Sequence, residues 1–138
     1  MYLFPNPKED YENLKYLVKH KYHVYKAGRA LGLPRGQLLK HDLSKLSPSE
    51  WTPYKTFFFN KKHTPRDYDK FRQAVTSHHY PNNPHHGQYW KSRGQNMPRK
   101  FKLEQLADWY GAGKAQGRIS KNQNFIDWLD MKAKQSNE

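Results

Sequence analysis

Residues 38–51 have the sequence LLKHDLSKLSPSEW, which marks the end of one helix and the beginning of the next. A short helix is expected over residues 35–44, with His41 and Asp42 near its end. Ser47-Pro48-Ser49-Glu50 combines a capping box with proline at the first helical position, so a further helix is expected to begin there. The chain therefore passes from one helix into another within a few residues of a histidine–aspartate pair.

Helical signals continue on both sides of this stretch. A first helix is expected over residues 8–31, because apolar side chains and His20 recur there every three to four positions. Thr64-Pro65-Arg66-Asp67 repeats the capping pattern and opens a fourth helix that runs to about residue 78. A fifth helix follows Met97-Pro98, and Asn122 or Asn124 caps the last one.

Two segments do not have helical signals. Residues 80–95 are rich in proline, asparagine and glycine, which predicts a long structured loop, and the polar tail after Lys132 is expected to fray. Strand-like alternation is absent from the sequence. The sequence thus predicts an all-α chain, with one helical domain of about six helices over residues 1–138.

The composition limits the partners and the chemistry. The chain has 138 residues, and its 25 lysines and arginines against 12 acidic residues give a formal net charge of +13, which favours anionic partners. It has no cysteine, so a metal would have to be bound by histidines and carboxylates. Because it has neither an apolar run of 18 residues nor a signal-peptide pattern, we expect a soluble protein without membrane contact. Its expected location is the cytoplasm, or the host cytoplasm if the gene belongs to a phage.

The histidines are concentrated in one segment. Four of the eight, His78, His79, His85 and His86, fall within nine positions. Neutral imidazole is a common ligand for zinc, iron, manganese and cobalt, which favours a metal site. The alternative is that these histidines lie on a basic surface and contact an anion.

Further candidate ligands lie on three of the expected helices. His20 faces the apolar side of the first helix more directly than His23, which is a competing candidate. Asp108 lies beside Leu106 and Ala107, and a buried aspartate needs a cation, an arginine or a metal as its partner. The order His, His-Asp, Asp therefore indicates a metal site more strongly than any one of its members.

This order is similar to the H … HD … D signature of the HD-domain metal-dependent phosphohydrolases. HKYHVYKAGRALGL at residues 20–33 resembles their first ligand helix, and LLKHDLSK at residues 38–45 resembles their LLHDxxK motif. HDLSKLSPSEW, HHYPNNPHHGQYW and MPRKFKLEQLADW more closely resemble a family of small phage and bacterial proteins with no assigned activity, which is HD-like. The spacing from His20 to His41 is shorter than that superfamily usually shows.

The resemblance implies an HD-like fold and a ligand set. His20, His41, Asp42 and Asp108 would bind one metal ion, and His78 or His79 with His85 or His86 would bind a second. The implied cofactor is one or two divalent ions per chain, from manganese, iron, cobalt, nickel or zinc.

Three polar residues have candidate roles in catalysis. Asp42 would bridge the ions or orient the nucleophile, and Glu104 would hold a ligand or act as a base. Glu104 and Asp108 could instead pair with neighbouring cations. Lys45 would contact a substrate phosphate, with a solvated lysine near a helix end as the alternative.

A substrate contact is expected next to the histidine cluster. Tyr89, Lys91 and Arg93 interleave an aromatic ring with positive charges, a composition suited to stacking a base and binding its phosphate. Trp90 is expected to pack against the core, and Tyr89 could also do so. The sequence has no P-loop, GxGxxG or HExxH motif.

These features lead to one hypothesis and one alternative. The hypothesis is a divalent-metal-dependent phosphohydrolase that acts on a nucleotide or another phosphate ester and binds nucleic acid weakly. The alternative is a basic module that binds nucleic acid or a host protein and has a structural or vestigial metal site. Because Asp42 and Asp108 would repel each other without a cation, replacing Asp42 is expected to leave the stability of the metal-free protein level or higher.

Overall fold

Helices and connecting turns make up residues 7–136, the part of the chain that the computed structural model describes, and no strand occurs in that part. The all-α prediction is therefore confirmed. The elements are α1 Pro7–Ala30, α2 Arg35–Lys40, the 3₁₀ helix η1 Leu43–Leu46, α3 Pro48–Phe59, α4 Pro65–Ala74, the π-helical η2 Val75–His79, α5 Tyr80–Asn82, α6 Gly87–Lys91, α7 Arg99–Ala115 and α8 Phe125–Ser136.

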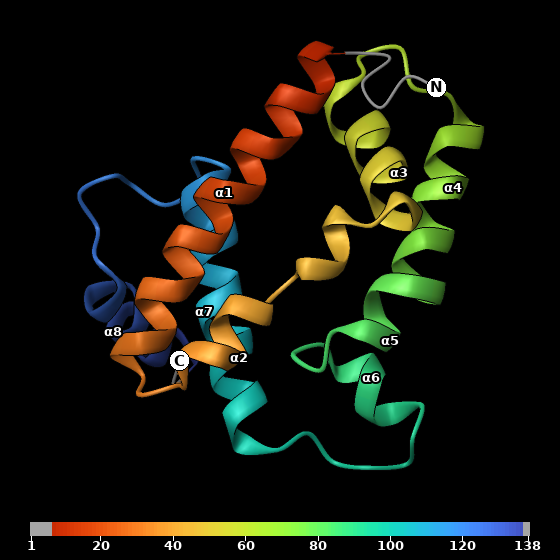
Figure 1. The fold of residues 1–138 in the computed structure, drawn as a ribbon. Helices are drawn as coiled ribbons and strands as arrows, with labels where there is room; N and C mark the ends of the chain where they lie inside the picture. Colours follow the sequence, from red (N-terminus) through yellow and green to blue (C-terminus); the bar gives the residue numbers. More distant parts are fainter. Residues whose placement is uncertain (1–6, 137–138) are drawn as a thin grey trace.

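The long helices α1 and α7 pack against each other more extensively than any other pair of elements. In Figure 1, α2 and α8 lie near the C-terminal end of α1, whereas α3 packs beside the N-terminal half of α1 and α4 packs against α3. The short helices α5 and α6 continue from the end of α4 toward α7. The chain from His41 to Leu46 thus connects two groups of helices.

An apolar core forms where α1, α2, α7 and α8 meet. Its buried residues are Val24, Ala27, Leu33, Leu38, Ala107, Tyr110, Phe125 and Trp128. The α1 face that carries Val24 and Ala27 also buries Leu17 and His20, in agreement with the predicted periodicity. The core therefore holds His20 on the same rigid face as its apolar residues.

Some helix boundaries agree with the capping signals in the sequence, and others do not. Thr64 and Asp67 form the predicted capping box of α4, and Asn124 Oδ1 accepts a hydrogen bond from the Asp127 N–H at the start of α8. α3 begins after Ser47 as predicted, but its capping box is absent. The Ser47 hydroxyl donates to the Ser44 carbonyl, and the Glu50 carboxylate contacts His78 and His79 instead.

Three other boundary predictions are wrong. The helix expected over residues 35–44 ends at Lys40, because Asp42 adopts left-handed backbone angles and η1 follows. The segment predicted as a loop contains α5 and α6, which are too short to produce a periodic apolar pattern. The predicted fraying after Lys132 does not occur up to Ser136, because α8 continues to that residue.

A glycine on α7 allows α1 and α7 to approach closely beside His20. A Cβ atom at Gly111 would lie 2.4 Å from Val24 Cγ2 and 3.1 Å from the His20 carbonyl oxygen. Contacts this short cannot be kept in a packed interior, so a larger residue would separate the helices. Gly111 lies one turn after Asp108, and it therefore also limits the distance between the His20 and Asp108 side chains.

We expect Gly111→Ala to lower the free energy of unfolding by about 1–3 kcal/mol, as overpacking in a core does. Gly36→Ala is the matched control, because Gly36 is also helical and a Cβ there would meet nothing within 4 Å. The free energy of unfolding of that variant should equal the wild-type value or exceed it by up to about 1 kcal/mol. Urea denaturation of both variants measures the difference, and equal stabilities would contradict the role of Gly111.

Candidate metal centre

Four side chains from α1, α7 and the end of α2 converge on one point. His20 Nε2 lies 3.3 Å from His41 Nε2, and both atoms lie close to Asp108 Oδ1, at 3.0 and 2.9 Å. Asp42 Oδ2 lies 3.4 Å from the His20 nitrogen and 3.5 Å from the His41 nitrogen. Ligands bound about 2.0–2.2 Å from one ion are separated by about 3.0–3.5 Å, so this spacing fits a single divalent cation.

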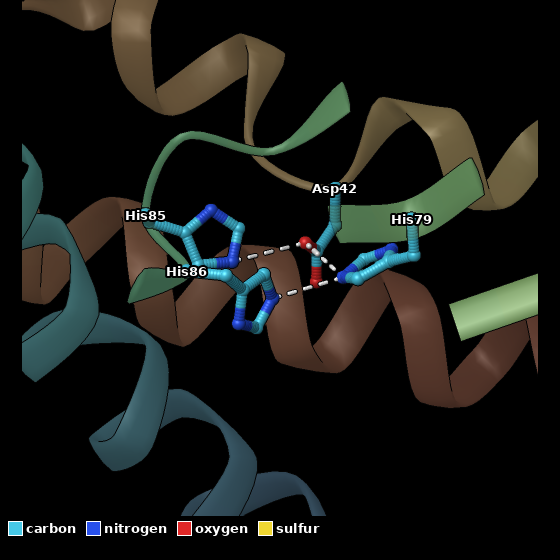
Figure 2. A group of neighbouring side chains, drawn as sticks. All are labelled: Asp42, His79, His85 and His86. Atoms are coloured by element: carbon cyan, nitrogen blue, oxygen red, sulfur yellow. Dashed lines mark hydrogen bonds and ion pairs between the residues drawn. The ribbon is translucent and has the colours of Figure 1, made fainter. Parts of the chain in front are cut away.

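The second oxygen of Asp42 faces a second group of side chains, shown in Figure 2. Asp42 Oδ1 lies 3.3 Å from His85 Nε2 and 3.5 Å from His79 Nε2. His86 Nε2 lies 3.0 Å from His79 Nε2, so these four residues could also hold an ion. Asp42 is therefore shared between two groups of donor atoms.

The donor atoms themselves fit a metal. Asp42 Oδ1 and His85 Nε2 are buried, and neither has a well-directed hydrogen bond within residues 7–136. Buried polar atoms without partners are rare in proteins, and a cation between these two would satisfy both. The donor set of imidazole nitrogens and carboxylate oxygens suits zinc, manganese, iron, cobalt or nickel.

The backbone at Asp42 directs its carboxylate inward. Asp42 has φ 56° and ψ 19°, the left-handed region, which aspartate tolerates better than most residues. Its N–H donates to Asn83 Oδ1 at 3.2 Å, while the Asn83 amide donates to the His79 carbonyl at 2.7 Å. Asn83 thus connects the Asp42 turn to the segment that carries the second group of histidines.

Two buried glutamates orient the histidines. Glu104 Oε2 lies 2.7 Å from His41 Nδ1 and 3.0 Å from His85 Nδ1. When Nδ1 donates a proton to a carboxylate, the Nε2 lone pair is left free for a ligand. Glu104 therefore accepts a hydrogen bond from His41 and lies beside His85, whose Nδ1 has no well-directed hydrogen bond among the described residues.

Glu50 of α3, like Glu104 of α7, lies beside the Nδ1 atoms of two histidines. It is fully buried, and its two oxygens lie 2.6 Å from His78 Nδ1 and 2.6 Å from His79 Nδ1. The π-helical turn η2 lets two consecutive histidines reach the same carboxylate, and such turns often occur at functional sites. His79 is thereby oriented with Nε2 toward Asp42.

The lysine after the His-Asp pair contacts Asp42 directly. Lys45 Nζ lies 2.9 Å from Asp42 Oδ2, and its side chain is 19% exposed, which differs from the solvated lysine of the alternative interpretation. Asp42 is therefore surrounded by an ammonium group and four imidazoles rather than mainly by another carboxylate. This reverses the expectation for replacing Asp42, because loss of its charge leaves buried cationic groups without a partner.

The buried charges shift several pKa values. Burial alone would lower the pKa of His41, but the neighbouring Asp42, Asp108 and Glu104 carboxylates outweigh it and raise this pKa to about 9. Burial would raise the pKa of Glu104, whereas hydrogen bonds and charge from His41 and His85 lower it to about 2. Burial and two adjacent histidines lower the pKa of His86 to about 3. Without a metal, the site is held together by imidazolium–carboxylate pairs.

Most of the residues selected from the sequence come together in this centre. They are His20, His41, Asp42, His79, His85, His86 and Asp108 as donors, with Glu104 and Lys45 in contact with them. His23 lies instead beside Tyr110, which supports the choice of His20. His78 belongs to neither donor group, because its Nδ1 is directed at Glu50.

The proposed substrate contacts lie outside the centre. Arg93 stacks on Tyr89, with its guanidinium carbon 3.6 Å from the ring centroid, and donates to the Tyr89 carbonyl. Lys91 is exposed. Among the described residues these three make no hydrogen bond or ion pair with the donor groups. Trp90 packs against Phe101, in agreement with its expected packing role.

Sequence reasoning missed three residues that support the site. Glu50 was assigned to a capping box, Asn83 lies in the segment predicted as a loop, and Gln37 was not considered. Gln37 donates to Glu104 Oε1 at 2.8 Å and lies one turn before His41, a spacing that could have identified it.

Comparison with known proteins gives a family for the chain. Residues 9–138 match the family of unknown function DUF5662, and the chain belongs to that family. No curated protein and no solved structure matches the chain. No helix among the described residues is both long and apolar enough to cross a membrane.

The raised pKa of His41 gives the metal-free protein a pH-dependent stability. A histidine with a raised pKa stabilises the fold fully below its unfolded value of about 6.5, and this contribution is lost as pH rises through about 9. We expect the free energy of unfolding to fall by about 1–3 kcal/mol between pH 6.5 and 9 in the presence of EDTA.

Urea denaturation at several pH values measures this change. Replacing exposed His63 by glutamine should leave the slope unchanged, and His41→Gln should reduce it. A wild-type stability that is constant over this range would show that His41 is not protonated in the folded protein.

Proposed function

We propose that the chain is a divalent-metal-dependent phosphohydrolase of the HD type, acting on a nucleotide or another phosphate ester. The observation that carries the proposal is the position of Asp42, whose two oxygens face two separate groups of donor atoms. A carboxylate in this position could be shared by two adjacent divalent ions, as sites with two metal ions would allow. The order of the ligands in the sequence supports the same assignment.

The residues divide into holding and positioning roles. His20, His41, Asp42 and Asp108 would hold one ion, and Asp42, His79, His85 and His86 the other. Divalent ions in such a site supply Lewis-acid polarisation of a phosphoryl oxygen and activation of water. Glu104 and Glu50 keep the histidine Nε2 atoms directed inward, so Glu104 acts as a positioning residue rather than as a base.

Lys45 can change partners during turnover. In the metal-free protein its ammonium group pairs with Asp42, which leaves it within reach of the same space as the donor atoms. Cations bound by Asp42 would compete with that pair. The released ammonium group would then be available to a substrate phosphate, to which lysine binds as a mobile point charge.

Metal binding should depend on Asp42. Wild-type protein purified without a histidine tag should contain at least one transition-metal ion per chain by elemental analysis. Asp42→Asn, which keeps the size of the side chain and tolerates left-handed backbone angles, should lose the metal and metal-dependent hydrolysis of bis(4-nitrophenyl) phosphate. It should also be about 1–3 kcal/mol less stable than metal-free wild type, because Lys45 and the histidines lose a partner.

Asp10→Asn is the matched control. Asp10 is also a buried acid, and it pairs with Lys55 Nζ at 2.7 Å and Trp51 Nε1 at 2.7 Å, but it contacts no histidine. This variant should lose stability and keep its metal and its activity. If Asp42→Asn binds metal as well as wild type, the proposed centre is wrong. If wild-type protein binds metal but does not hydrolyse the phosphate ester, the ion has a structural role and the proposed hydrolase activity is wrong.

A further inference from the structure

The protein surface is more basic than the net charge indicates. Asp10, Asp42, Glu50 and Glu104 are buried, and Asp108 lies in the metal centre with 15% of its side chain exposed. Of the 25 lysines and arginines, only Lys45 and Lys55 pair with a carboxylate among the described residues. Five of the 12 acidic residues are thus inside the protein or in the candidate centre, and most of the cations remain on the surface without an acidic partner among the described residues.

One acid-free part of the chain has several of its cations close together in the sequence. No aspartate or glutamate occurs between Asp69 and Glu104. We define the basic segment as residues 89–102, which covers the end of α6, the following loop and the first turn of α7. Its five cations are all exposed, and none forms an ion pair within the described structure: Lys91, Arg93, Arg99, Lys100 and Lys102.

The basic segment is attached directly to the candidate metal centre. Trp90 Nε1 donates to the Pro84 carbonyl at 2.7 Å, immediately before His85. At the other end, Gln37 donates to the Lys100 carbonyl at 3.1 Å and to Glu104. The segment therefore borders the site on the side of His85 and Glu104.

The segment also carries an exposed stacking element. The Arg93 guanidinium lies over the half-exposed ring of Tyr89 at 3.6 Å, and it pairs with no acid within residues 7–136. Arginine planes and aromatic rings are the groups on which unpaired bases stack. In a duplex both faces of a base are covered by the neighbouring base pairs, so the Tyr89–Arg93 pair favours a single strand over a duplex.

We propose that the basic segment binds single-stranded nucleic acid and directs its phosphodiester backbone toward the candidate metal centre. Five exposed cations over twelve residues are more than one mononucleotide needs, whereas successive phosphates of a strand could contact them in turn. The proposal rests on the proposed function for the reaction, and it specifies a polynucleotide as the phosphate ester.

Fluorescence anisotropy with a labelled 20-nucleotide oligo(dT), at 50 mM NaCl and with EDTA present, tests binding without hydrolysis. Lys91→Ala/Arg93→Ala/Lys100→Ala should weaken binding at least tenfold. It should also reduce the slope of log affinity against log salt by about 2, as expected for three lost phosphate contacts on a single strand. Tyr89→Ala should weaken binding about fivefold or more, through the loss of stacking.

Matched controls distinguish a defined binding site from general electrostatic attraction between the basic protein and the oligonucleotide. Arg118→Ala/Lys121→Ala/Lys134→Ala removes the same charge from exposed positions around α8, and Tyr22→Ala removes an exposed ring from α1. Both controls should bind within about threefold of wild type. Equal losses in the two triple variants, wild-type affinity of Tyr89→Ala, or tighter binding of duplex DNA or heparin than of oligo(dT) would each overturn the proposal.

The result is independent of the metal centre. Because EDTA is present, the oligonucleotide affinity of the wild-type protein is measured without bound metal and without turnover. Failure of the proposed hydrolase and failure of the proposed strand-binding surface are therefore seen in different measurements.

Discussion

The structure depends on one buried carboxylate. Asp42 is 2% exposed and lies within 3.5 Å of side chains from α1, η1, η2 and the loop before α6. A carboxylate in such a position is stable only if its charge is compensated, since burial of an unpaired ion is very unfavourable. Lys45 and the surrounding imidazoles supply that compensation in the metal-free protein. The elements that carry them are thereby held around a single point.

This constraint explains the unusual use of charge in the chain. Two of the imidazoles that face Asp42 have an orienting carboxylate, because Glu104 Oε2 lies 2.7 Å from His41 Nδ1 and Glu50 Oε1 lies 2.6 Å from His79 Nδ1. Five of the 12 acids, Asp10, Asp42, Glu50, Glu104 and Asp108, thus lie where they do not neutralise surface lysines. The basic surface and the histidine–carboxylate centre are two consequences of the same distribution of residues.

Much of this arrangement can be predicted from the sequence, for reasons that differ between its parts. Proline and capping residues act locally, so the starts of α3 and α4 are correct, and the apolar periodicity of α1 correctly places His20 on the buried face. The end of α2 depends on a contact between Asp42 and Asn83 that is distant in sequence, and no local pattern encodes it. Glu50 was misassigned because a glutamate at the third position of a helix has the same pattern whether it caps the helix or orients a histidine.

The two donor groups differ in how they are supported. His20 and Asp108 lie on long helices that share a packed apolar core, whereas η1, α5 and α6 bury no apolar residue. The segment with His85 and His86 is held instead by polar contacts, including those of Asn83, Trp90 and Asp42. Regions with few buried apolar contacts open locally at a small free-energy cost. An ion bound by Asp42, His79, His85 and His86 would therefore stabilise this segment more than the α1–α7 pair, and it would fix the position of the basic segment that begins three residues after His86.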